Sequence, residues 1–136
     1  MPEASIKLRE EVAIRNQIED WAKAVRERDL AGVLRNHAEN ILMFDVPPPL
    51  VSRGLEEYKK TWELFYSSSE TPAVFDIREL RVTAGDQVAF AAALMRCTVK
   101  ENGNDYVDLD FRLTICLCKI DDEWIVTHEH HSIPAV

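Results

Sequence analysis

The spacing of apolar residues near the start of the chain predicts two helices. Four apolar positions recur at steps of four, three and four, so they share one stripe of a long helix that ends near Arg28: Ile14, Ile18, Trp21 and Val25. Asp29 is suited to cap a short second helix, because its side chain can accept from the free N–H groups of the first turn. Leu30, Val33 and Leu34 are its expected buried side. We expect Asn40 to end it.

A short apolar run, 41–46, predicts a strand that is followed by a third helix. Pro47, Pro48 and Pro49 end this strand, because a proline cannot donate to a strand ladder. Gly54 begins the helix, and steps of three, four and three place four side chains on one of its faces: Leu55, Tyr58, Trp62 and Phe65. The serines at 67–69 mark its expected end.

From residue 73 onward, β-rich segments alternate with turn residues. We expect strands at about 73–84, 87–101, 106–120 and 123–132, separated by Gly85-Asp86, by 102–105 and by Asp121-Asp122. Consecutive strands joined by tight turns are antiparallel. The sequence therefore predicts one α+β domain over residues 1–136, a cone-shaped, curved antiparallel sheet packed against three helices from the N-terminal half, with its apolar lining on the concave side.

The turn at Asp121-Asp122 sorts the side chains of the last two strands into faces. A two-residue turn gives these pairs: Trp124 with Lys119, Val126 with Leu117, His128 with Ile115 and His130 with Leu113. Carried across 102–105, this register collects on the concave face Phe90, Ala92, Leu94, Arg96, Phe111, Leu113, Ile115, Leu117, Val126, His128 and His130. The opposite face collects Met95, Cys97, Asp110, Arg112, Thr114, Thr127, Glu129 and His131. A one-residue bulge would invert part of this assignment.

Three polar side chains, Arg96, His128 and His130, interrupt the predicted apolar lining and therefore need partners. Asp45, at the end of the first strand, is the candidate carboxylate. It either caps the proline turn or transfers protons in the cavity. Arg96 either binds an acidic group of a ligand or pairs with Asp45. The two histidines can also chelate a transition metal, but Asp45 is the one obvious further ligand, so we expect no metal and histidines that either have partners within the protein or face a ligand.

Composition and charge narrow the classes of partner. The chain is 46% hydrophobic and carries a net charge of −8, which disfavours nucleic acid and anionic membrane surfaces. No apolar run is long enough to cross a bilayer, and the N-terminal residues lack the order of a signal peptide. Three cysteines without zinc-ligand spacing fit reduced thiols. We therefore expect a cytoplasmic protein without a cofactor. The mixed face that carries Met95, Cys97 and Thr114 favours a homodimer.

Three segments of the chain resemble the NTF2-like superfamily, and within it the SnoaL-like, ketosteroid-isomerase-homolog branch: WAKAVRERDLAGVL, FDVPPPLVSRGLEEYKKTW and DLDFRLTICLCKIDDEWIVTHEHHSIP. The resemblance implies a cone-shaped, commonly dimeric α+β fold. It places Asp45 at the position of the catalytic base of ketosteroid isomerase. Trp21 and Ile115 stand at or near the positions of the two oxyanion donors, and isoleucine has no donor, so that oxyanion hole is absent in its familiar form.

These observations lead to two functional hypotheses. The first is a small-molecule pocket with cofactor-free acid–base catalysis of the isomerase, cyclase or dehydratase type on an apolar, carbonyl-bearing compound. Its catalytic residues are Asp45, His128 and His130, and its ligand-binding residues are Arg96, Trp21, Tyr58, Trp62, Phe90, Leu94, Phe111, Leu113 and Ile115. The second is a ligand-binding or dimerisation module of the same fold without catalysis.

Overall fold

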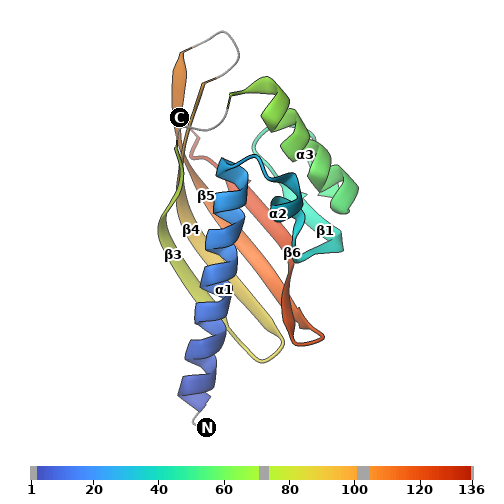
Figure 1. Ribbon diagram of the computed structural model, residues 1–136, viewed down its shortest axis with the longest axis vertical. Helices are drawn as coiled ribbons and strands as arrows, with labels where there is room; N and C mark the ends of the chain where they lie inside the picture. The colour runs from blue at the N-terminus through green and yellow to red at the C-terminus, as the bar shows by residue number, and fades with distance from the viewer. Residues whose placement is uncertain (1–2, 71–73, 101–104, 136) are drawn as a thin grey trace.

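The chain folds into three helices and a six-stranded sheet (Figure 1). The computed structural model describes residues 3–70, 74–100 and 105–135. The elements are α1 (Glu3–Arg26), α2 (Leu30–Leu34), β1 (His37–Phe44), β2 (Ser52–Arg53), α3 (Leu55–Ser68), β3 (Val74–Ala84), β4 (Val88–Lys100), β5 (Tyr106–Ile120) and β6 (Glu123–Ser132). Among the described residues, no helix is both long and apolar enough to cross a membrane.

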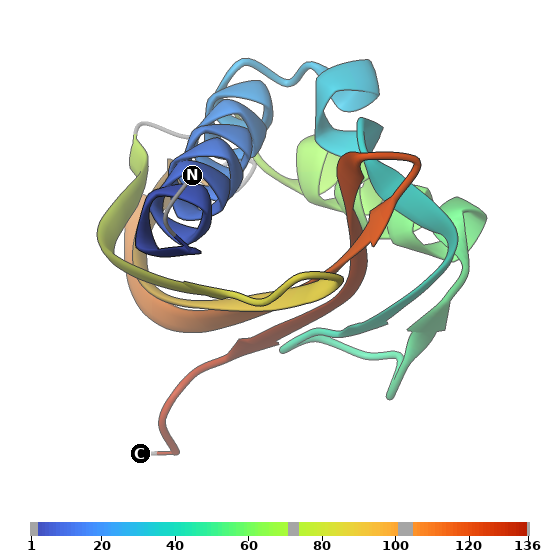
Figure 2. The same ribbon diagram turned by 90° about the horizontal axis from the view of Figure 1, so that it is seen from below.

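The sheet is curved, and its strand order is β2-β1-β6-β5-β4-β3. Every neighbouring pair is antiparallel except β1 and β6, which run parallel, so the sheet is mixed. Figure 2 shows the sheet wrapping around α1, with α2 and α3 beside it on the same concave side. The α+β architecture of a curved sheet and three helices is therefore confirmed, with one parallel pair that the sequence pattern did not reveal.

Most elements begin and end close to the predicted residues, but the strand expected at 41–46 is found at His37–Phe44, and β2 was not expected. Asp29 caps α2 as expected, and its Oδ1 accepts a hydrogen bond from the Gly32 N–H at 3.1 Å. The prediction that Asn40 ends this helix is wrong. The helix already ends at Leu34, Asn36 adopts a positive φ of 58°, and β1 starts at His37. Asn40 therefore lies inside a strand.

A bulge in β6 changes which of its side chains face the helices. Lys119 pairs with Trp124 and Leu117 with Val126, as predicted, but the register then shifts by one residue and Cys116 pairs with His128. Beyond the shift, every side chain of β6 points to the face opposite the predicted one. The assignment of His128 and His130 to the concave face is therefore wrong, and Glu129 and His131 occupy that face instead.

A second register difference inverts the predicted faces of β4. The prediction placed a four-residue turn at 102–105, but Lys100 pairs with Tyr106, which leaves five residues between the strands. Most of that turn, 102–104, lies outside the described residues. The concave side of β4 therefore carries Ala89, Ala91, Ala93, Met95 and Cys97, and its outer side carries Phe90, Ala92, Leu94 and Arg96. The predicted placement of these two sets is wrong, because one residue more in a loop reverses a strand's faces.

Gly54 is the residue that lets the chain pass from β2 into α3. It takes φ 86° and ψ 162°, a region that essentially only glycine adopts, and its N–H donates to the Ile41 carbonyl at 2.7 Å. This confirms the prediction that Gly54 begins the third helix. The face of that helix predicted to be apolar is the one that packs inward, with Tyr58 and Trp62 buried.

Replacing Gly54 with alanine should lower the free energy of unfolding by about 1–3 kcal/mol, because a Cβ strains this backbone conformation. Chemical denaturation measures the change. The matched control is Lys60→Ala, on the exposed side of α3, where alanine favours the helix. Equal stability of the Gly54→Ala variant and the wild type would contradict the assignment of strain to this residue.

Candidate functional site

A fully buried carboxylate, that of Glu129, lies at the centre of the polar interior. Glu129 is 0% exposed and stands on the concave face of β6. Its Oε2 accepts hydrogen bonds from the Tyr58 hydroxyl and from His37 Nε2, both at 2.8 Å. Its Oε1 accepts from His131 Nε2 at 2.9 Å. Three donors from β1, α3 and β6 thus replace the water that this charge loses on burial.

These contacts favour an ionised Glu129 together with protonated forms of His131 and Tyr58. Burial alone raises the pKa of Glu129, but hydrogen bonds from His131 and His37 and their charges outweigh it and lower that pKa to about 2. Burial lowers the pKa of His131, but its hydrogen bond to Glu129 and the charges of Glu129 and Asp45 raise it overall. Burial and the Glu129 charge hold the pKa of Tyr58 well above its ordinary value. Glu129 is therefore ionised and Tyr58 remains a proton donor at neutral pH.

Aromatic rings fill the interior around the cluster. Trp21 Nε1 donates to the Tyr58 hydroxyl at 3.2 Å, which ties α1 to α3. The His131 ring stacks on Phe111, with centroids 5.8 Å apart, and meets the edges of Trp21 and Trp62. Six of the predicted ligand-binding residues lie in this packed core: Trp21, Tyr58, Trp62, Phe111, Leu113 and Ile115.

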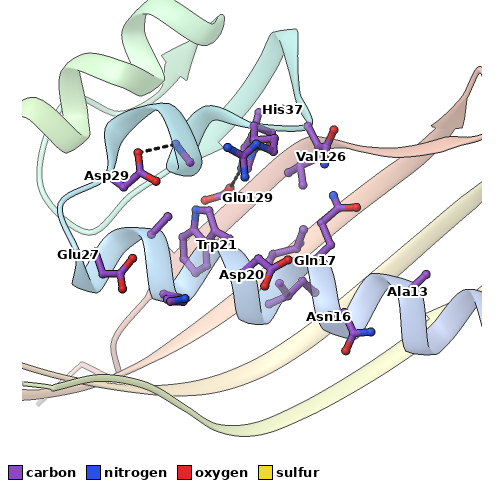
Figure 3. Close-up of a pocket in the computed structure, with 17 residues that line it drawn as sticks. Ala13, Asn16, Gln17, Asp20, Trp21, Glu27, Asp29, His37, Val126 and Glu129 are labelled. Atoms are coloured by element: carbon purple, nitrogen blue, oxygen red, sulfur yellow. Dashed lines mark hydrogen bonds and ion pairs between the residues drawn. The ribbon is translucent and has the colours of Figure 1, made fainter.

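A cavity of about 460 Å³ opens beside α1, between that helix and the α2–β1 connection (Figure 3). Trp21, Ile115, His37 and Glu129 contribute to its inner wall, and polar and charged side chains of α1 and the connection form the rest. These outer residues include Asn16, Gln17, Asp20, Lys23, Glu27, Asp29, Arg35 and Asn36. Of the predicted site residues, Trp21 and Ile115 line this cavity, whereas Asp45, His128 and His130 do not.

His37 connects the cavity to the buried carboxylate. Figure 3 shows its ring directly beside Glu129 at the inner wall. Its Nδ1 lies 2.7 Å from the Arg35 carbonyl and its Nε2 is bonded to Glu129, so both ring nitrogens face oxygens that accept hydrogen bonds. A histidine whose one nitrogen is held by a carboxylate, with the other near a cavity, is an arrangement suited to proton transfer.

Asp45 does not line the cavity and lies near His131. It is half-buried just after β1, and its Oδ1 accepts from the Val46 N–H at 2.8 Å, the turn-capping contact considered above. The parallel register pairs Phe44 with His130, so the next residues, Asp45 and His131, are neighbours. This position explains why the Asp45 charge raises the pKa of His131. Asp45 thus acts on the cluster through His131.

The other predicted site residues lie on the outer face of the sheet. His128 Nδ1 is 2.6 Å from the Leu42 carbonyl, and the exposed His130 ring packs on Phe44. Arg96 forms an ion pair with Asp110 at 3.5 Å, not with Asp45. Phe90 and Leu94 are 52% and 46% exposed on the same face. Within the described ranges, no three histidine, cysteine or acidic side chains are arranged to hold a metal ion.

Sequence reasoning missed His37, Glu129 and His131 as members of the site. Residues 128–131 read His-Glu-His-His, so either register of β6 places titratable side chains inside the fold. The alternation of residues carries no signal of the bulge that selects Glu129 and His131. His37 follows Asn36, whose positive φ brings the chain into β1, and a lone histidine beside a helix end gave no separate indication.

Comparison with known proteins shows what the chain is similar to. The family model described as a SnoaL-like domain matches residues 14–136. An NTF2-like protein of unknown function from Pseudomonas putida KT2440 is 32% identical, with 93% of this chain and 88% of that chain covered and a TM-score of 0.84. A search of curated proteins gives no match.

Two further solved structures share the fold at low identity. A scytalone dehydratase-like protein from Novosphingobium aromaticivorans is 13% identical, with 97% of this chain and 89% of that chain covered and a TM-score of 0.86. A ketosteroid isomerase-like protein from Erwinia carotovora atroseptica is 14% identical, with 90% and 95% covered and a TM-score of 0.79. At these identities the likeness concerns the fold alone.

Replacing Glu129 with glutamine should lower the free energy of unfolding by about 3–5 kcal/mol, because it breaks a buried, hydrogen-bonded ion cluster. In the wild type, the lowered pKa of Glu129 stabilises the fold above pH 4.5, and this contribution is lost as the pH falls towards about 2. The raised pKa of His131 stabilises the fold below pH 6.5, and this contribution is lost as the pH rises through the folded pKa.

The stability contributed by this cluster should therefore be greatest between pH 4.5 and 6.5. Denaturation at a series of pH values measures it, with Glu63→Gln on the exposed side of α3 as the control. The difference between wild type and Glu129→Gln should shrink towards either extreme of pH. A difference that is independent of pH would show that the cluster is not ionised as described.

Proposed function

Because the chain belongs to the SnoaL-like domain family, we propose that it is a small-molecule pocket protein that performs cofactor-free acid–base chemistry on a carbonyl-bearing compound. The cavity beside α1 supports this proposal, since its volume of about 460 Å³ suits a small organic ligand. The pair of Glu129 and His37 at its inner wall is the observation that carries the proposal.

The acid–base group in this proposal is His37. Its Nε2 is held by an ionised carboxylate, which fixes the ring and stabilises the positive charge that forms when Nδ1 takes up a proton. The Arg35 carbonyl now occupies the Nδ1 contact, and Arg35 itself lines the cavity. The base is the neutral ring with its one proton on Nε2, donated to Glu129, and a ligand that displaces the Arg35 carbonyl would bring its C–H group to the unprotonated Nδ1. Glu129 is then a positioning residue.

The proposed reaction starts with abstraction of a proton from a carbon next to a carbonyl group. The C–H bond breaks, the proton moves to His37 Nδ1, and the electron pair forms an enolate whose charge rests on oxygen. Lys23 on α1 and Arg35 on the opposite wall line the cavity and are the cations available to that oxygen. They take the place of the oxyanion donors that Trp21 and Ile115 do not supply. Return of the proton to another carbon completes an isomerisation.

Replacing His37 with glutamine should slow this proton abstraction by about 10²–10⁴-fold, the usual contribution of a positioned acid–base group. The measurement is exchange of α-hydrogen for deuterium in D₂O, followed by NMR, over a panel of small ketones and β-keto acids. The wild type should exchange at least one member of the panel well above the buffer rate. Glutamine keeps a donor towards Glu129, so the fold should be retained, and circular dichroism checks this.

The matched control for this experiment is His130→Gln, the same substitution at an exposed histidine outside the cavity. It should exchange as fast as the wild type. Equal exchange by the wild type and the His37→Gln variant would reject His37 as the acid–base group. Tight binding of a panel member without any exchange would favour the ligand-binding module over the enzyme.

Self-association through the outer face of the sheet is a second function that a specific observation favours. Four outward residues of β4 are exposed and apolar: Val88, Phe90, Ala92 and Leu94. Arg96 and Asp110 lie beside this stripe, so a two-fold interface can pair each with its counterpart. Met95 and Cys97, which the sequence had placed on this face, are buried in the core. We propose a homodimer with this stripe at its centre.

A charge in the middle of the stripe should separate the dimer. Leu94→Lys is expected to give a monomer at micromolar concentrations, because the unpaired ammonium would be buried at the interface. Light scattering coupled to size-exclusion chromatography measures the mass. Leu64→Lys, at an exposed leucine on α3, is the control and should leave the dimer intact. A wild-type monomer, or a dimer that survives Leu94→Lys, would contradict this interface.

A further inference from the structure

We infer that Glu129 couples His37 to His131, so that the charge on one imidazole controls the proton held by the other across the protein interior. Each histidine bonds a different oxygen of the same carboxylate, His37 at Oε2 and His131 at Oε1. The inference deepens the proposed function. It rests on that function only where the proton of His37 is used in catalysis. It identifies His131 as a positioning residue for the acid–base group.

The geometry makes the two rings compete for one negative charge. Glu129 is 0% exposed, so no solvent screens its oxygens from either ring. The side chains of His37 and His131 are 3% and 7% exposed. When one ring becomes positive, it uses part of the stabilisation that the carboxylate offers and repels a positive charge on the other. Groups that interact this closely titrate as a pair.

Apart from Glu129, the two rings contact different groups, so each proton site has its own surroundings. The Nδ1 of His37 lies against the Arg35 carbonyl at the cavity wall, an acceptor that favours a proton there. His131 stacks on Phe111 and neighbours Asp45, whose negative charge favours a proton on that ring. The cluster therefore links a proton site near Asp45 to a proton site at the cavity.

Other groups that face the cluster are either uncharged or lie at its edge. Tyr58 from α3 donates to Glu129 and remains protonated, and Trp21 from α1 donates to Tyr58. The side of β5 that faces the cluster is apolar, with Phe111, Leu113 and Ile115. The charged residues that line the cavity beside His37 are Asp20, Lys23, Glu27, Asp29 and Arg35. The Tyr58 hydroxyl also lies 3.2 Å from His37 Nε2, but among the described residues the Glu129 carboxylate is the group with a hydrogen bond to both rings.

The coupling can be measured on the ligand-free full chain by NMR titration of histidine side chains. The chain has four histidines, so protein labelled with ¹⁵N-histidine gives few signals, and loss of one signal in His37→Gln assigns His37. The test variant is His131→Phe, which keeps the ring stacked on Phe111 but removes both the donor and the charge. His37 is then the one histidine bonded to the carboxylate, so its midpoint should move upward by about one pH unit or more.

The matched control is His130→Phe, the same substitution on the outer face, which should leave the His37 midpoint unchanged. His131→Gln is the second variant. It keeps an N–H donor for Glu129 and cannot titrate, so it reports the charge alone if His131→Phe does not fold. It should also move the midpoint upward. A His37 midpoint that is the same in the His131 variants as in His130→Phe would overturn the coupling.

This titration and the exchange assay fail independently. Coupled titration without any α-hydrogen exchange would keep the inference and reject catalysis. Exchange that depends on His37, together with an unchanged His37 midpoint in the His131 variants, would keep the proposed function and reject the coupling. If the coupling and the catalysis are both present, the pH profile of exchange in His131→Gln should shift upward, as the His37 midpoint does. Loss of stability alone does not produce such a shift.

Discussion

The buried negative charge of Glu129 is the constraint on which the interior of this protein depends. A carboxylate with no exposed surface costs several kcal/mol unless donors replace its water, and here three elements supply them. β1 contributes His37, α3 contributes Tyr58 and β6 itself contributes His131. The hydrogen bonds that stabilise the buried charge therefore also hold α3 and the start of β1 against the sheet. Stability and candidate chemistry rest on the same contacts.

The parallel pairing of β1 with β6 explains how the two oxygens of Glu129 can each bond a different histidine. Because the two strands run in the same direction, His37 at the start of β1 lies near the middle of β6, and Asp45 just after β1 lies beside His131. Trp21 extends the network to α1 through its bond to the Tyr58 hydroxyl. α1 also forms one wall of the cavity, so the cluster and this wall share Trp21.

Much of the fold follows from the sequence pattern, whereas the site does not. The four long strands begin and end within a residue or so of their predicted limits, since Gly85, Asp121 and Asp122 are strong turn signals. Faces are harder to predict, because the side-chain period of a strand is two and one extra residue inverts everything beyond it. Two extra residues invert predicted faces here, one between β4 and β5 and one at the bulge in β6. The positions of Asp45, Trp21 and Tyr58 depend on neither of these residues, so the expected faces of their elements are not inverted.

The energetics of the interior favour the bulged register over the regular one. Without the bulge, β6 would turn His128 and His130 inward, towards a tyrosine hydroxyl and a third histidine. That interior would hold several donors and no carboxylate to accept from them. With the bulge, Glu129 accepts from Tyr58, His37 and His131, and the two outward histidines pack against Phe44 beside water. The cost of one irregular residue in a ladder is thus offset by the three hydrogen bonds that Glu129 accepts. Local alternation along β6 does not contain this information, because it arises from partners on β1 and α3.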